Sequence, residues 1–134
     1  MANAIYPKAK EQMLQGGINL SSGTVKVALV DTGVYVYSAA HEFFSSVSAG
    51  VVGTPQTLGT KTFVNGVFDA ADVTFPTVSG ANAEALIIYI DTGVAGTSRL
   101  ISFQDTGVTG LPVTPNGGDI NVVFDSGANK IFAL

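Results

Sequence analysis

Apolar residues recur along this chain in the short blocks that β-strands produce. Residues 24–30 are apolar on both sides apart from Lys26, which is typical of a strand covered on both faces of a sheet. The other blocks are short or alternate with polar residues, and turn residues separate them. They predict eight further strands, at residues 34–37, 61–64, 67–69, 73–75, 83–90, 99–104, 120–124 and 130–134.

The best helical pattern lies near the N-terminus. Pro7 suits the first position of a helix, where its missing N–H costs nothing. Gly16 and Gly17 supply the left-handed stop that commonly ends a helix. The spacing therefore predicts one short helix, with an inward face that carries Tyr6, Ala9 and Met13.

Short strands at roughly ten-residue spacing, with little helix, predict an all-β domain. We expect a sandwich or jelly-roll-like fold of about eight or nine strands with one short N-terminal helix, and a barrel is the alternative. Asn65-Gly66 adds the strongest short hairpin signal. The 134 residues have the size of one domain, with an N-terminal arm and helix at residues 1–20 and the β sandwich at residues 21–134.

The chain is poor in charge. Charged residues make up 12% of it, apolar residues make up 46%, and the net charge is −4. Only six residues are basic and they form no run, which argues against nucleic-acid binding. We expect no transmembrane helix and no signal peptide, because no apolar run has the required length or position. With so little charge, we expect much of the surface to be covered by copies of the chain or by a larger assembly.

The sequence Asp-Thr-Gly-Val occurs three times, beginning at Asp31, Asp91 and Asp105. Asp-Thr-Gly after an apolar strand is also how aspartic proteases present a carboxylate, two of which share one proton. Here valine follows each glycine, where the small retroviral-type enzymes usually carry alanine. We therefore interpret the copies as type I turns in three-residue hairpins, with the aspartate accepting an N–H two residues on and the glycine left-handed. The three aspartates should be exposed at strand ends.

The remaining polar residues predict no catalytic, metal or cofactor site. His41 is the only histidine, there is no cysteine, and no G-x-S-x-G motif is present, so neither a zinc shell nor a serine triad is indicated. Asp69, Asp72, Asp119 and Asp125 lack the spacing of a calcium loop and are interpreted as solvated turn residues. We therefore expect a protein that is not an enzyme and binds no cofactor.

Aromatic and loop residues are better candidates for contacts with other proteins. Tyr35 and Tyr37 alternate with valines on a predicted strand that is bulky on both faces, so one face is available to a partner chain. Burial of that strand within one domain is the alternative. The N-terminal segment and the loop at residues 111–118 are the natural contact arms. The interface candidates are Tyr6, Tyr35, Tyr37, Leu111 and Val113.

Several long segments resemble a known group of proteins. They include "ANAIYPKAKEQMLQGGINL", "YSAAHEFFSSVSAG", "GVFDAADVTF" and "EALIIYIDTG". In this order, and over nearly the whole chain, they are similar to a family of small virion proteins of tailed bacteriophages, encoded among the head and tail genes. The resemblance carries over no catalytic residue. It implies a structural protein of the virion that is present in the host cytoplasm during assembly.

Within this family we favour a capsid decoration, or cement, protein on the capsid surface. Decoration proteins usually form trimers with closed cyclic symmetry, and they bind across several capsid subunits so that weak contacts add through avidity. The expected partners are therefore other copies of the chain, as a homotrimer, and the major capsid protein. The alternatives are a tail, neck or fibre component, including one that contacts the host surface, and more remotely a protease of the Asp-Thr-Gly type.

Overall fold

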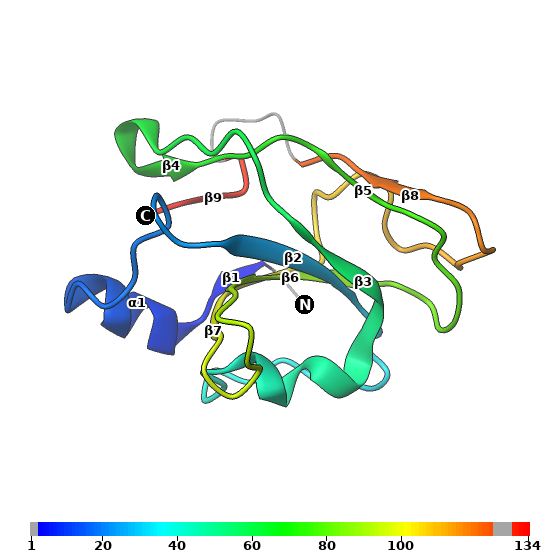
Figure 1. Cartoon of the computed structure of the whole chain (residues 1–134), viewed down its shortest axis with the longest axis horizontal. Coiled ribbons are helices and arrows are strands. Elements are labelled where there is room, and N and C mark those ends of the chain that lie inside the picture. The colour runs from blue at the N-terminus through cyan, green and yellow to red at the C-terminus, as the bar shows by residue number, and fades with distance from the viewer. Residues whose placement is uncertain (1–2, 125–129) are drawn as a thin grey trace.

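The centre of the molecule is a five-stranded antiparallel sheet. In the computed structural model, which describes residues 3–124 and 130–134, the strand order is β1-β7-β6-β2-β3 (Figure 1). Neighbouring strands pair antiparallel throughout this sheet. The strands are β1 Ala4–Ile5, β2 Val25–Val30, β3 Val51–Thr57, β6 Ala85–Ile90 and β7 Arg99–Gln104.

The three inner strands of this sheet are buried on both faces. Side chains of β2, β6 and β7 are almost all buried, whichever side of the sheet they point to. One face is covered by two short ribbons, which pair β4 (Val67–Phe68) with β9 (Phe132–Ala133) and β5 (Val73–Phe75) with β8 (Ile120–Val122). The chain between β2 and β3 covers the other face, including the short helices η1 (Phe44–Ser46) and η2 (Ser48–Gly50) (Figure 1).

Helix α1 (Pro7–Leu14) forms where the sequence predicts it, at one end of the sheet (Figure 1). Pro7 occupies its first turn, and Gly16 ends it with a φ of 76°. The N–H of Gly17 then closes the end by donating to the carbonyl of Gln12 at 2.8 Å. The predicted inward face is confirmed, because Tyr6 and Ala9 are buried and Met13 packs against the core. At eight residues α1 is too short to cross a bilayer, and the described parts of the chain hold no longer apolar helix.

The prediction of an all-β domain with one short helix is confirmed. Nine strands lie in antiparallel sheets among the described residues, and they do not close into a barrel. The predicted strands at 24–30, 67–69, 73–75, 83–90, 99–104, 120–124 and 130–134 each contain an observed strand. Long apolar runs therefore identified the doubly covered centre of the sheet correctly.

The predicted strand at residues 34–37 is wrong. The N–H groups of Val34 and Tyr35 both donate to the carbonyl of Asp31, at 3.1 and 3.0 Å, so the chain turns directly after β2. Val34 and Val36 point to solvent while Tyr35 is only 3% exposed. Alternation of buried and exposed side chains is present, but the segment crosses a face of the sheet and pairs with no strand.

Strand β3 was not predicted, because its sequence contains Gly53 and Pro55. Both residues are tolerated here because β3 is the edge strand of the sheet. Gly53 has a φ of 72°, and the pairing with β2 shifts register between Val27 and Leu29 at this point. This is the geometry of a β-bulge, which glycine permits. Because a bulge inserts an extra residue, the strand does not show a simple alternation of apolar and polar residues.

The hairpin signal at Asn65-Gly66 is confirmed as a turn but not as a pair of strands. Asn65 and Gly66 have φ values of 56° and 76°, as a type I′ turn requires of both residues. Below the turn, Thr62 and Asp69 exchange backbone hydrogen bonds of 2.9 and 3.1 Å. Residues 61–64 nevertheless form no strand. Thr62 makes only an isolated antiparallel bridge to Asp69, and β4 pairs with β9.

Candidate interaction surface

The three Asp-Thr-Gly-Val sequences follow directly on β2, β6 and β7. Oδ1 of Asp31 accepts the N–H of Gly33 at 2.8 Å, and Oδ1 of Asp91 accepts the N–H of Gly93 at 3.0 Å. This is the predicted local hydrogen bond, two residues along the chain. All three aspartates lie at strand ends, as predicted, but they are half-buried rather than exposed.

The turns themselves differ from one another and from the predicted hairpin. Gly93 and Gly107 are left-handed, with φ values of 87° and 75°. Gly33 does not have a positive φ. None of the three copies closes a three-residue hairpin; the connection from β6 to β7, for example, spans residues 91–98. The shared sequence therefore marks strand ends without fixing one turn type.

Strand register separates the carboxylates. Val30 lies opposite Ala85, and Val25 lies opposite Ile90, so Asp31 and Asp91 follow strands that end at opposite ends of the sheet. Asp105 lies at the same end as Asp31, but β6 runs between their strands, which places the two backbones about 10 Å apart. The register therefore gives no support for a proton shared between two of these carboxylates within one chain, which the protease interpretation would need.

The second copy carries a pH-dependent contribution to stability. The Gly93 N–H holds the pKa of Asp91 below its ordinary value of 3.8, and Lys26, with Nζ 3.1 Å from Oδ2, adds to this effect. A carboxylate with a lowered pKa stabilises the folded state above its ordinary pKa and loses this contribution as the pH falls through the lowered value. We expect Asp91→Asn to be about 0.5 kcal/mol less stable near neutral pH, and this difference should be smaller at about pH 2.

Urea unfolding at both pH values checks this prediction. Asp31→Asn is the matched control, since Asp31 makes the same backbone hydrogen bond and has no lysine partner among the described residues. A wild-type advantage over Asp91→Asn that persists undiminished at about pH 2 would contradict the assignment.

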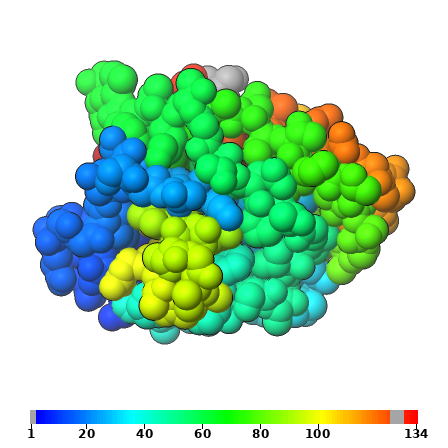
Figure 2. All heavy atoms as spheres, viewed as in Figure 1, coloured from blue at the N-terminus to red at the C-terminus, as the bar shows by residue number. Residues whose placement is uncertain are grey.

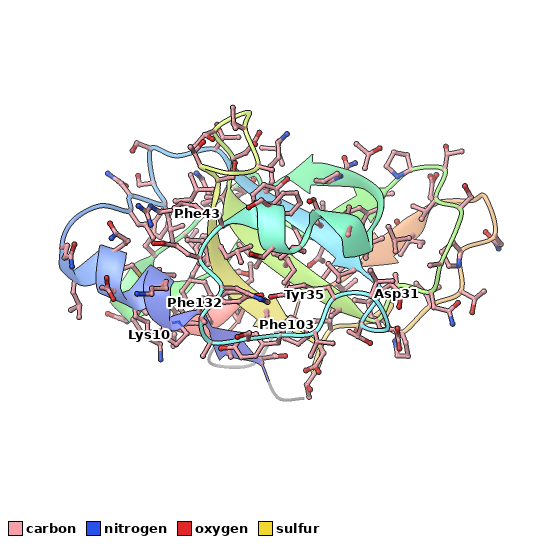
Figure 3. All side chains as sticks on the ribbon, turned by 90° about the horizontal axis from the view of Figure 1, so that it is seen from below. Lys10, Asp31, Tyr35, Phe43, Phe103 and Phe132 are labelled. Atoms are coloured by element: carbon pink, nitrogen blue, oxygen red, sulfur yellow. The ribbon has the colours of Figure 1, made fainter. Side chains whose placement is uncertain are left out.

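Two tyrosines and the histidine form a hydrogen-bonded chain beneath the sheet. The hydroxyls of Tyr6 and Tyr35 lie 2.7 Å apart, and the Tyr35 hydroxyl lies 2.9 Å from Nδ1 of His41. Tyr35 also packs near Phe103 of β7, as Figure 3 shows. Burial raises the pKa values of both tyrosines, so both hydroxyls stay protonated and available as donors. The cluster ties α1 and the chain after β2 to the central sheet.

This geometry corrects the interface prediction for Tyr6 and Tyr35. Tyr6 is fully buried and Tyr35 is 3% exposed, so both side chains belong to the core of one chain, as the alternative interpretation had it. Tyr37 is half-buried and packs on Tyr6 with ring centroids 5.1 Å apart. His41 lies just ahead of Phe43 and Phe44 at the turn before η1, and its hydrogen bond to Tyr35 was not predicted.

Tyr35→Phe is expected to destabilise the protein by about 2 kcal/mol, because it leaves the buried hydroxyl of Tyr6 without its partner. Tyr6→Phe should cost about 1 kcal/mol, since Tyr35 keeps its hydrogen bond to His41. The half-buried Tyr37, changed to Phe, is the control and should change stability by less than about 0.5 kcal/mol. Chemical denaturation measures all three, and equal values for Tyr35→Phe and Tyr37→Phe would refute the role of the cluster.

The loop candidates Leu111 and Val113 lie against the body of the protein. Both are half-buried and pack on the hydrophobic core. Val113 also exchanges two backbone hydrogen bonds with Ala83, of 2.9 and 3.0 Å. The part of the loop that contains Leu111 and Val113 is therefore fixed to the chain ahead of β6, in contrast to the expected free arm.

Two of the turn aspartates that we considered as calcium ligands accept hydrogen bonds from backbone N–H groups. Oδ1 of Asp72 accepts the N–H of Phe124 at 3.1 Å, and Oδ1 of Asp119 accepts the N–H of Thr77 at 3.0 Å. Asp125 lies outside the described residues. Within residues 3–124 and 130–134, no group of three or more His, Cys, Asp or Glu side chains is placed to hold a metal ion.

A small apolar surface at the β4–β9 corner is the strongest interaction feature that the sequence did not reveal. Phe63, Val64 and Leu134 are 40%, 71% and 73% exposed. We call these three residues the corner patch. The hairpin that carries Phe63 and Val64 protrudes from one corner of the molecule in Figure 2, where it is coloured green.

Local contacts bring the corner patch together and fix its position. The N–H of Leu134 donates to the carbonyl of Gly66 at 2.9 Å, which places the C-terminal residue beside the type I′ turn. Phe63 stacks on Phe68 of β4 with ring centroids 5.6 Å apart. Lys61 anchors the base of the hairpin by donating from Nζ to the carbonyl of Leu20 at 2.7 Å. The patch is therefore an exposed apolar surface whose position the fold fixes.

Sequence reasoning missed the corner patch because residues 61–64 were assigned to a strand. The pairing of β4 with β9 links segments about 65 residues apart, and no local pattern encodes it. No protein-family model matches the chain, and no curated protein is similar to it in sequence.

Proposed function

We propose that this chain is a non-enzymatic structural protein of a tailed-bacteriophage virion, and specifically a capsid decoration protein that binds and stabilises the head shell. The main observation behind the proposal is the combination of few charges with exposed apolar side chains. Only 12% of the residues are charged, and eight large apolar side chains of the described residues are exposed. Such a surface suits a protein that is covered by neighbours in an assembly.

Because the sequence resembles small virion proteins, we propose that this assembly is the phage particle. The all-β domain is consistent with the proposal, because a rigid sheet with two covered faces can present loops and corners to neighbours without rearranging. As a decoration protein the chain would form a homotrimer on the capsid surface and contact several copies of the major capsid protein. The corner patch is the contact surface that we assign to this binding.

Electron microscopy of particles that lack the gene tests the proposal. We expect these particles to lose a surface density from the head and to break at a lower temperature than wild-type particles, because each trimer links several shell subunits. A deletion particle that keeps every surface density and its full heat resistance would refute the proposal. Loss of a tail or neck density, with an unchanged head, would support the tail, neck or fibre alternative instead.

Rebinding of purified protein to the deletion particles tests the assigned surface. Val64→Asp places a charge in the corner patch and should abolish rebinding while leaving the fold intact, because Val64 is 71% exposed. Val94→Asp is the matched control, at a 60% exposed valine in the loop after β6, and should rebind as the wild type does. Equal rebinding of both variants would show that another surface makes the contact.

A further inference from the structure

A second surface feature borders β9, the strand that leads to Leu134 of the corner patch. A groove of about 610 Å³ runs between β1 and the start of α1 on one side and β9 on the other. This volume lies within the range of roughly 300–1,000 Å³ that is usual for ligand sites. Lys10 and Phe132, both of which line the groove, lie at the same end of the molecule in Figure 3.

The floor of the groove contains a buried hydroxyl with no partner. Ser102 of β7 is 1% exposed, and its Oγ makes no hydrogen bond to any described residue. Gln104, two positions along the same strand, donates from its side-chain amide to the carbonyl of Ile131 and so ties the floor to the chain before β9. A buried hydroxyl is normally hydrogen-bonded, so an unpaired one that lines a groove indicates a partner from outside the chain.

The groove is positively charged in a chain that is negative as a whole. Lys10 and Lys130, two of the six basic residues, line it, and no Asp or Glu of the described residues does. Neither lysine forms an ion pair with a described residue, whereas the neighbouring Lys8 pairs with Glu11 at 3.6 Å. A carboxylate in the groove would therefore meet two positive charges and no negative charge from the described lining residues.

The wall of the groove is a free strand edge. β1 is the last strand of the central sheet. The N–H of Tyr6 donates to the carbonyl of Ile101 at 2.9 Å, and Ala4 pairs with Phe103, so these alternate positions face β7. The N–H and C=O of the intervening Ile5 consequently point away from β7, on the side where an added strand would lie.

We propose that this groove binds an extended acidic peptide segment of another protein. Its backbone adds to the free edge of β1 at Ile5, its carboxylates lie against Lys10 and Lys130, and one of its polar groups pairs with the hydroxyl of Ser102. Strand addition supplies affinity through the main chain, and the lysines select for acidic side chains. This inference goes beyond the proposed function and does not depend on it.

The test uses a labelled, capped peptide of four valine-glutamate repeats and the same peptide with glutamine in place of glutamate. We expect fluorescence anisotropy to show that the glutamate peptide binds at least about tenfold more tightly at low salt, with the difference shrinking as salt is added. Amide signals of Ile5 and Phe132 should shift on binding. Absence of binding by the glutamate peptide, or equal binding of the two peptides, would overturn the proposal.

Variants separate the groove from the rest of the surface. Lys10→Gln combined with Lys130→Gln should weaken binding of the glutamate peptide about tenfold, whereas Lys8→Gln, on the same helix but outside the groove, should have no effect. Ser102→Ala should weaken binding without lowering the melting temperature of the free protein, because its hydroxyl has no partner to lose. Free acetate provides a further control. If acetate saturates the groove at the same concentration at which it displaces the peptide, the groove is a small-anion site and the proposal of peptide binding is overturned.

Discussion

Ile87→Ala and Ile88→Ala are each expected to lower the free energy of unfolding by about 2–5 kcal/mol. The two residues are neighbours on β6, so their side chains point to opposite faces of the central sheet. Both are fully buried. Ile87 pairs with Phe103, which packs near Tyr35 on one face. Ile88 pairs with Ser102 on the other face, where Gln104 is hydrogen-bonded to the chain before β9. The pair of variants therefore probes the two covering layers separately.

Urea denaturation of both variants measures this effect. Val36→Ala is the control, since its side chain is 73% exposed and its loss should change the free energy of unfolding by less than about 0.5 kcal/mol. A large effect for one isoleucine and a change of less than about 0.5 kcal/mol for the other would mean that one face of the sheet is open in solution. That result would contradict the layered fold.

Gly110→Ala is expected to destabilise the protein by about 3 kcal/mol, for two reasons that act together. Gly110 has a φ of 105°, which residues with a Cβ rarely adopt. A Cβ added there would also lie closer than 3.0 Å to the carbonyl oxygen of Asn121, which is backbone and cannot rotate away. The clash would separate Thr109 from Val123, which exchange two hydrogen bonds of 3.0 Å next to β8.

Two further glycines separate these causes. Gly117 has a φ of 87° and open space around it, so Gly117→Ala should cost only the backbone strain, about 1 kcal/mol. Gly96 has open space and no positive φ, so Gly96→Ala should change stability by less than about 0.5 kcal/mol. Thermal or urea unfolding of the three variants measures the series, and a Gly110→Ala variant as stable as Gly117→Ala would refute the close approach to Asn121.

The sequence predicted the centre of the fold better than its edges. The sequences of β2, β6 and β7 are apolar on both sides because both faces of the sheet are covered. Such apolar runs can be recognised from the sequence alone. Strand β3 was not predicted because the bulge at Gly53 and the presence of Pro55 interrupt the alternation of apolar and polar residues. An edge strand tolerates both. The pairing of β4 with β9 depends on segments far apart in sequence, which local patterns do not specify.

Site residues were predictable only where the interaction is local. The hydrogen bonds of Asp31 and Asp91 to N–H groups two residues on were predicted, because the tripeptide itself encodes them. The alternating tyrosines did not reveal that Tyr35 turns inward to Tyr6, since that contact joins residues 29 positions apart. The corner patch and the groove beside β1 likewise arise from the chain's return at β9, which only the structure shows.

The central proposal is that the chain is a structural part of the phage head. The most direct test is its copy number in purified particles of the phage that encodes it, measured by quantitative mass spectrometry after heads and tails have been separated. We predict copies on the order of hundreds per particle, recovered with the heads, because a decoration protein follows the repeated symmetry of the shell. A few copies recovered with the tails, or none in the particle, would contradict the account.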